Sequence, residues 1–295
     1  MKPSILLTFF LGVLSIELTA QTYVDLMRID HNQGLSQSYD DASNSTARFD
    51  ETTFDGLAPI VLDSSNVLIT GVNLEHTTVS QSPNSFTEIY GLILKLGYSR
   101  KFSDKFTGTF IALPKLSSDL KNVNGDHVQI GGVALFKLKK SQHFSYKFGL
   151  YSNSDLFGPM VVPIVGFYYR KEKWEANFTL PISAWMSYDL GESTKLGAKF
   201  QGINKSYLLN NGTPTYMEKI NNEVSLYLQQ GFGKWHLILA GGHTIGRSGK
   251  FYDTNDKLGV ALSAVKLDNN RTPLNDRFSD GFFIKSSLIF RLPTD

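Results

Sequence analysis

The sequence contains no cysteine at any of its 295 positions. This absence excludes disulfide bonds, thiolate metal sites, a cysteine nucleophile and the acylated cysteine that anchors a lipoprotein. Charged residues are also few, at 19% of the chain, and the formal net charge is only +2. A chain so close to neutral gives no electrostatic reason to expect a nucleic-acid partner.

Long hydrophobic runs are missing as well. The apolar run at residues 5–14 is too short for a membrane-spanning helix, which needs roughly 20 residues. Lys2 precedes this run, and a more polar segment ending in Ala20 follows it, which is typical of an export signal. We predict a signal peptide over residues 1–20, cleaved before Gln21, and one domain over residues 21–295. If that domain enters a membrane, it must do so as a closed barrel.

Residues 173–180 show the pattern that recurs along the chain. Trp174, Ala176, Phe178 and Leu180 alternate with polar residues, so a strand here would have one apolar face and one polar face. A helical period would scatter both sets around the helix axis. The same alternation is present in residues 143–151, 195–203, 223–229, 234–239 and 282–291.

About fourteen strands are predicted from this pattern. They cover residues 23–29, 49–62, 67–79, 86–102, 106–116, 128–139, 143–151, 160–169, 173–180, 183–188, 195–203, 218–230, 234–246 and 281–292. If residues 173–180 and 183–188 are one strand, and one further predicted division between strands is also absent, the count becomes twelve. Residues 258–267 also alternate, but another crossing would place the C-terminus on the wrong side, so we expect an external hairpin there. Loops are predicted at residues 31–47, 152–159 and 205–215.

Tight polar turns alternate with longer loops along this series, and both termini then lie on one side. Short turns on one side and long loops on the other are typical of outer-membrane barrels. Strand length, aromatic residues near strand ends and the export signal favour an all-β transmembrane antiparallel up-and-down β-barrel. The alternative is a soluble exported β-sandwich or propeller, which can show the same alternation.

Several segments carry a resemblance to a known family. These are LPKLSSD at residues 113–119, FGLYSNSDLFGP at 148–159, IGR at 245–247, and residues 274–276 with 280–281. Together they resemble a Bacteroidota family of outer-membrane β-barrel proteins that carry a domain of unknown function. The likeness covers nearly the whole mature chain and implies the barrel fold, but no reaction. Many such barrels end on an aromatic residue recognised during assembly, whereas this chain ends on Asp295, five residues after Phe290.

No catalytic residue is predicted. A hydrolase of the barrel rim would need a histidine beside a serine or a carboxylate, and His76, His127 and His243 lie near predicted outer strand ends. Sequence neighbours in a strand point to opposite faces, so the spacing defines no triad. There is no His-Glu-X-X-His motif. The acidic residues of the late loop could bind calcium, although such loops usually carry no ion. We therefore predict no metal and no cofactor.

Polar residues of the alternating strands are the candidates for a functional site. The lumen-lining candidates are Lys173, Glu175, Asn177, Lys195, Lys199 and Lys285. The candidates for the mouth and its loops are Lys115, Asp119, Asp155 and Arg247. Charges of both signs on one face indicate either a wet pore or an internal salt-bridged plug.

The expected function is porin-like passage or binding of a small solute whose identity the sequence does not give. A lipid hydrolase at the rim and a structural or adhesive surface barrel are the alternatives. The expected partners are outer-membrane lipid, lipopolysaccharide and the barrel-assembly machinery.

Overall fold

A computed structural model describes residues 23–35, 37–38, 46–81, 85–210, 214–263, 265–275 and 280–293. The predicted signal peptide lies outside the described residues. Within these ranges, helix is confined to the short 3-10 turn η1 (Gly125–His127). None of the described segments forms a helix long and apolar enough to cross a membrane.

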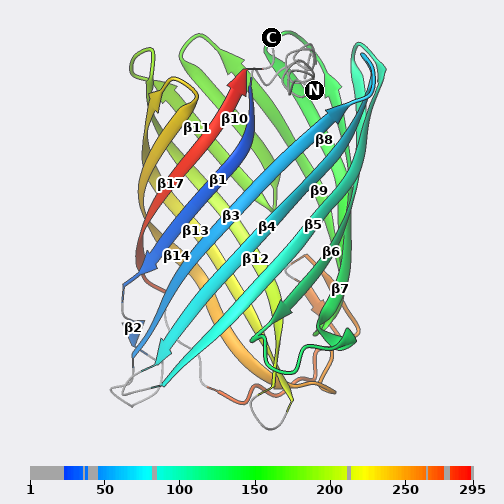
Figure 1. Cartoon of the computed structure of the whole chain (residues 1–295), viewed down its shortest axis with the longest axis vertical. Coiled ribbons are helices and arrows are strands. Elements are labelled where there is room, and N and C mark those ends of the chain that lie inside the picture. Colours follow the sequence, from blue (N-terminus) through cyan, green and yellow to red (C-terminus); the bar gives the residue numbers. More distant parts are fainter. Residues whose placement is uncertain are drawn as a thin grey trace, which may run out of the picture.

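Fourteen antiparallel strands form a closed barrel (Figure 1). In ring order they are β1 (Tyr23–Gly34), β3 (Thr46–Val61), β4 (Asn66–Gln81), β5 (Ser85–Ser103), β6 (Phe106–Ser118), β7 (Val128–Lys139), β8 (Phe144–Asp155), β9 (Gly158–Lys171), β10 (Trp174–Leu180), β11 (Ser183–Asp189), β12 (Thr194–Leu209), β13 (Thr215–Phe232), β14 (Trp235–Asp253) and β17 (Phe282–Pro293). Pairing of β17 with β1 closes the ring. The predicted fold class and the count of fourteen are confirmed.

The two faces of the wall are reversed relative to a soluble protein. Large apolar side chains point outward and are exposed, and Leu226 reaches 68%. Charged side chains point inward, where Glu175 is 1% exposed. In a sandwich or a propeller the apolar face would be buried in the core. The alternation of residues 173–180 therefore places Trp174 and Phe178 on the outside of the barrel and Glu175 on the inside.

The barrel has two different ends. Six tight turns lie at the upper end of Figure 1, where β1 also begins and β17 ends, and we call it the short-turn end. The opposite end is the long-loop end. The turn between β3 and β4 shows how the tight turns are held: the side-chain amide of Asn66 and the backbone N–H of Ser65 donate to the Asp63 carboxylate. These hydrogen bonds lower the pKa of Asp63.

Three of the predicted loops are wrong over much of their length. Strand β1 continues to Gly34, β8 continues to Asp155, and β12 continues to Leu209. The continuations of β1 and β8 are polar because alternate side chains face the barrel interior, where Asn32, Asn153 and Asp155 are buried, and not because they are solvated loops. Residues 36 and 39–45 of the first predicted loop lie outside the described part of the chain.

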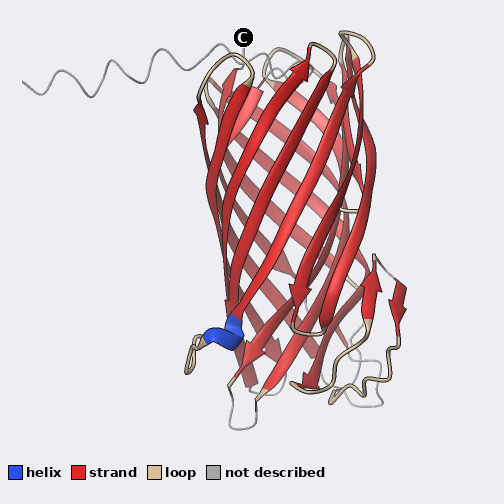
Figure 2. Ribbon diagram, turned by 90° about the vertical axis from the view of Figure 1, so that its right-hand side faces the viewer, coloured by secondary structure: helices blue, strands red, loops and turns tan. Residues whose placement is uncertain are grey.

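The expected external hairpin is present as β15 (Val260–Leu262) and β16 (Val265–Leu267), which pair with each other outside the ring of fourteen. Figure 2 shows the two short strands beside the lower part of the wall. This hairpin does not project freely, because β15 also pairs in parallel with the edge of β9 at Ala261 and Met160. A further two-residue strand, β2 (Gln37–Ser38), pairs with β3.

Strands β10 and β11 are unusually short, with seven residues each. The bend that joins them, at Pro181 and Ile182, therefore lies partway along the wall and not at the long-loop end. The last backbone bond from β12 to this pair is donated by Gly202 to the Ile182 carbonyl, at 2.9 Å. Beyond Gly202, none of the described strands continues the wall on that side of β12.

Candidate functional site

Beyond Gly202, β12 and the facing part of β13 turn into the barrel. We call the described residues 204–210 and 214–220 the plug hairpin. Tyr207, Leu208 and Leu209 are consecutive and all buried, and so are Tyr216 and Met217. Consecutive residues in a strand point to opposite faces, so burial of all of them means that both faces are covered. A hairpin in the wall would have one face exposed.

The plug hairpin reaches the far side of the barrel. Leu208 pairs in parallel with Ser118 of β6, and its carbonyl accepts a hydrogen bond from the backbone N–H of Asp119 at 3.2 Å. Gln129 of β7 donates to the Ser206 carbonyl at 3.2 Å. Strands β6 and β7 lie opposite β12 in the ring order, so the plug hairpin spans the lumen near the long-loop end.

Buried ion pairs attach the plug hairpin to β3 and β4. The Glu75 carboxylate of β4 accepts hydrogen bonds from Lys205 and Tyr207 and lies 3.4 Å from the Lys219 ammonium. Lys219 also forms an ion pair with Glu51 of β3. Glu75, Lys219 and Tyr207 are buried. Charges away from bulk water are tolerated only when they are paired, and here each carboxylate has a lysine partner.

A second polar group attaches the plug hairpin to β6 and β8. Lys115 and Asp155 form an ion pair at 2.8 Å, and the Ser206 hydroxyl donates to Asp155 at 3.0 Å. The Asp119 carboxylate accepts a hydrogen bond from the backbone N–H of Asn210 at 3.0 Å. Three of the four residues predicted for the mouth thus contact the plug hairpin or a residue bound to it.

Apolar clusters cover the two faces of the plug hairpin. The first consists of Phe49, Val79, Ile89, Tyr207, Leu209 and Met217, and the second of Phe157, Met160, Val162, Leu208, Tyr216, Tyr252, Leu258 and Ala261. Arg247, the fourth residue predicted for the mouth, is buried with its guanidinium 4.1 Å from the centre of the Phe49 ring. The plug hairpin is therefore packed as a core, not loosely placed in the lumen.

The connection between β14 and β17 packs on the plug hairpin. Arg271 of this loop has a fully buried side chain that donates to the Tyr216 hydroxyl at 3.0 Å and to the Glu218 carboxylate at 3.1 Å. Lys266 binds the same carboxylate at 2.6 Å. Burial alone would lower the pKa of Arg271, but the hydrogen bond to Tyr216 and the charge of Glu218 outweigh it and raise the pKa. Arg271 is thus charged at any physiological pH.

Replacing Arg271 by glutamine is expected to loosen this loop. Loss of charged hydrogen bonds to a buried carboxylate costs about 1.5–3 kcal/mol, which corresponds to roughly a 10- to 100-fold larger open population. Proteinase K digestion of the detergent-solubilised protein should then cut within residues 254–275 at lower protease concentration. Lys257→Gln, an exposed change in the same loop, is the control and should leave cleavage unchanged. Equal cleavage of the Arg271→Gln variant and the unmodified protein would contradict the role of Arg271.

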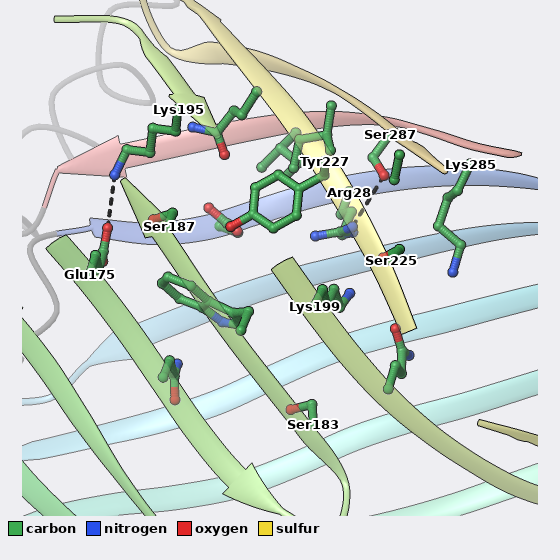
Figure 3. A pocket seen from close by; sticks show the side chains of 18 of the residues that line it. Arg28, Glu175, Ser183, Ser187, Lys195, Lys199, Ser225, Tyr227, Lys285 and Ser287 are labelled. Carbon is green, nitrogen blue, oxygen red and sulfur yellow. Dashed lines mark hydrogen bonds and ion pairs between the residues drawn. The ribbon is translucent and has the colours of Figure 1, made fainter. Parts of the chain in front are cut away.

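A cavity of about 320 Å³ lies in the lumen and extends toward the short-turn end (Figure 3). Strands β1, β10, β11, β12, β13, β14 and β17 line it. Its charged lining residues are Asp25, Arg28, Glu175, Lys195, Lys199, Glu223, Lys285 and Arg291. Hydroxyl groups face it from Ser183, Ser187, Ser225, Tyr227 and Ser287. The cavity thus combines charges of both signs with many hydrogen-bonding groups.

Most of the cations in the cavity are matched by a carboxylate. The pairs are Lys195 with Glu175 at 2.8 Å, Arg291 with Asp25 at 2.5 Å, Arg28 with Asp30 at 2.8 Å, and Lys285 with Glu223. Arg291 also lies over the Tyr23 ring, 3.7 Å from its centre, at the short-turn end. These pairs fix the positions of long side chains that would otherwise move freely in a wet lumen.

The predicted lumen residues fall into two groups. Glu175, Asn177, Lys195, Lys199 and Lys285 all line the cavity. Lys173 does not: it is exposed in the turn that precedes β10, and its ammonium lies 5.7 Å from the centre of the ring of Tyr188, an outward-facing residue. Lys173 has the same strand parity as Glu175. Strand β10 begins at Trp174, however, so Lys173 precedes the strand.

Sequence reasoning missed the contribution of β1 to the cavity. Arg28 and Asp30 face the lumen, yet they fall on the opposite parity from Tyr23 and Asp25, which also line it. The cause is an irregularity in the pairing of β1 with β17 between Asp25 and Met27. A bulge of this kind adds one residue and reverses the faces. The sequence does contain a signal for these lumen positions: Arg28 and Asp30 are two residues apart and carry opposite charges, so they can pair on one face of a strand.

The three histidines near the rim lie apart from one another. His76 stacks on Tyr90 on the outer face, with ring centres 4.8 Å apart, and His243 packs against Phe282 at 4.8 Å. His127 is buried at the end of η1. His76 also lies 3.8 Å from the Glu88 carboxylate on the outer face. Among the described residues, none of the three is hydrogen-bonded to a serine hydroxyl, and no group of three or more metal-ligating side chains gathers. In the described chain one rim histidine thus has a carboxylate beside it, and none has a hydrogen-bonded serine.

Comparison with protein families gives one match. The family described as "Domain of unknown function (DUF6268)" matches residues 65–258, which is well over half of the chain. Comparison with curated proteins gives no match.

Comparison with solved structures gives membrane barrels at low sequence identity. The COG4313 outer membrane channel from Pseudomonas putida F1 is 10% identical, with a TM-score of 0.47, over 95% of this chain and 98% of that one. The NanC porin is 11% identical, with a TM-score of 0.38, over 90% and 100%. The translocator domain of the autotransporter NalP from Neisseria meningitidis is 10% identical, with a TM-score of 0.40, over 91% and 89%. All three of these TM-scores are below 0.5.

Proposed function

We propose a function for this chain from its own geometry, because it belongs to the DUF6268 family, which is described only as a domain of unknown function. The chain acts as a porin-like barrel of a bacterial outer membrane. Its lumen cavity binds a small solute, and the solute passes when the plug hairpin moves out of the lumen. A Bacteroidota origin and export by the signal peptide are parts of the same proposal, supported by the sequence resemblance and by residues 1–20.

The outer surface supports placement in a membrane. Outward-facing side chains on neighbouring strands are apolar and exposed, as lipid-facing positions of membrane barrels are. Aromatic pairs lie near the short-turn end, Trp235 with Phe290 and Trp174 with Tyr188, which is where a girdle at the lipid boundary is expected. Membrane lipid therefore surrounds the wall, with lipopolysaccharide around its external half, and the barrel-assembly machinery inserts it. The short-turn end faces the periplasm.

One observation carries the proposal. A closed barrel holds a polar cavity of about 320 Å³, and an element of the same chain crosses the lumen nearer the long-loop end. A purely structural barrel has no need of an internal site with ordered charges. An open diffusion pore would lack a packed hairpin across its lumen. The combination is what a barrel that binds a solute and opens to pass it requires.

Shortening the plug hairpin is expected to turn a closed barrel into a conducting one. Residues 204–220 are replaced by a two-residue turn, which leaves Gly202 and Asn222 facing each other as in the intact pairing. In planar lipid bilayers the intact protein should show rare openings or none. The shortened variant should show stable single-channel currents, because the segment that crosses the lumen is gone.

Correct insertion of both proteins has to be shown in the same experiment. Heat-modifiable migration on gels and resistance of the wall to protease serve as the controls. A correctly inserted shortened variant without current would overturn the proposal and favour a structural surface barrel.

A further inference from the structure

Lys199 differs from the other cations of the cavity. Within the described part of the chain, Arg28, Lys195, Lys285 and Arg291 each have a carboxylate partner, whereas Lys199 on β12 has none. Its ammonium lies within electrostatic reach of two further cations, Arg28 and Lys285. Figure 3 shows Lys199 beside Arg28, with both side chains directed into the cavity. The cavity therefore has one lysine side chain that no carboxylate of the described residues pairs with.

Groups around Lys199 provide further hydrogen bonds. Ser183, Gln201 and Ser225 line the same cavity. The Ser287 hydroxyl also lines the cavity and accepts a hydrogen bond from Arg28 at 3.1 Å. Hydroxyl and amide groups both donate and accept, which suits a solute with several hydroxyl groups. The cavity volume lies at the small end of the range of ligand sites.

Resting on the proposed function, we infer that the cavity binds a small solute with one carboxylate and several hydroxyl groups, and that Lys199 receives the carboxylate. Carboxylates of the wall limit the solute to a single negative charge. Asp30 and Glu223 act on Lys199 as well, and they would repel a second negative charge on the solute. Phosphate monoesters carry close to two negative charges at neutral pH and fit less well. An ammonium that has no anion beside it in a confined site gains most from such a solute.

Three sugars of matched size test this inference by calorimetric titration of the full-length protein in detergent. They are gluconate with one negative charge, glucose with none and glucosamine with one positive charge. We expect gluconate to bind, and glucose and glucosamine to bind at least about tenfold more weakly. Lys199→Gln should reduce gluconate affinity about 10- to 100-fold, because one charged hydrogen bond is lost. Lys199→Arg should retain most of it.

Lys137→Gln is the matched control, since Lys137 faces the lumen from β7 but does not line the cavity. Unchanged circular dichroism and heat-modifiability of the Lys199 variants show that the barrel is intact. Equal gluconate affinity in Lys199→Gln and the unmodified protein would overturn the inference, and so would tighter binding of glucosamine. The result is independent of conductance. If the shortened variant conducts and gluconate does not bind, the anion site is wrong and the pore stands. If gluconate binds and the shortened variant does not conduct, the anion site stands and the pore is wrong.

Discussion

Replacing Glu75 by glutamine is expected to lower the free energy of unfolding by about 3–5 kcal/mol. Glu75 is buried where the plug hairpin meets β4, and its carboxylate faces Lys205 and Lys219. Without the carboxylate, Lys205 loses its ion-pair partner, and Lys219 keeps Glu51 and a hydrogen bond to Thr77. Buried charges that lose their partner account for most of the cost of breaking such a network.

Urea unfolding in phospholipid vesicles, followed by tryptophan fluorescence, measures this effect. Glu88→Gln is the control, since Glu88 faces outward and its side chain is 45% exposed. That change should lower the free energy of unfolding by less than about 1 kcal/mol. If Glu75→Gln unfolds at the same urea concentration as Glu88→Gln, the ionic contact does not hold the plug hairpin.

Replacing Phe178 by arginine is expected to destabilise the inserted barrel by about 2–4 kcal/mol if the residue lies near the bilayer midplane. Phe178 faces outward and stacks on Phe167, with ring centres 4.7 Å apart. An arginine there would have to place its charge in lipid. Refolding into vesicles should become less efficient, and the urea midpoint should fall.

The same substitution on the inner face gives the comparison. Ser183 lines the cavity on β11, next to Ala184, which pairs with Phe178. The two positions therefore lie at nearly the same depth, and Ser183→Arg places its charge in a wet lumen. Its effect should be under about 1 kcal/mol, as for other exposed changes. Equal effects at both positions would mean that the outer face does not meet lipid.

The wall of the barrel could be predicted from the sequence because it depends on local alternation. Strand β7 matches its predicted range of residues 128–139. The inward course of the plug hairpin could not be predicted in this way. Residues 206–209 read Ser-Tyr-Leu-Leu and do not alternate, because both of their faces are covered. Such a segment has the same pattern as a loop when only its neighbours in the sequence are considered.

The same limit applies to the candidate site. Inward parity identified Lys199 and Lys285 as lumen residues, because each lies in a regular strand. The sequence could not predict which charges form ion pairs, because partners such as Lys205 and Glu75 are 130 residues apart. Their contact depends on how the ring closes and on which hairpin leaves the wall. Arg28 was missed for a third reason, the irregular pairing of β1 with β17.

The short β10–β11 pair leaves two strand edges exposed within the wall. Where this pair ends, the backbone groups of β9 and β12 lose their neighbours, and unpaired backbone groups are very costly next to lipid. The carbonyls of Val161 on β9 and of Phe157, just before β9, accept hydrogen bonds from the backbone N–H groups of Ser263 and Leu258 of the late loop, both at 2.9 Å. On β12, the edge is drawn inward and pairs with β6 at Leu208. The β15–β16 hairpin and the inward course of the plug hairpin thus both supply hydrogen-bond partners for backbone groups that the short β10–β11 pair leaves unpaired. If β10 and β11 were as long as their neighbours, they would pair with these backbone groups themselves.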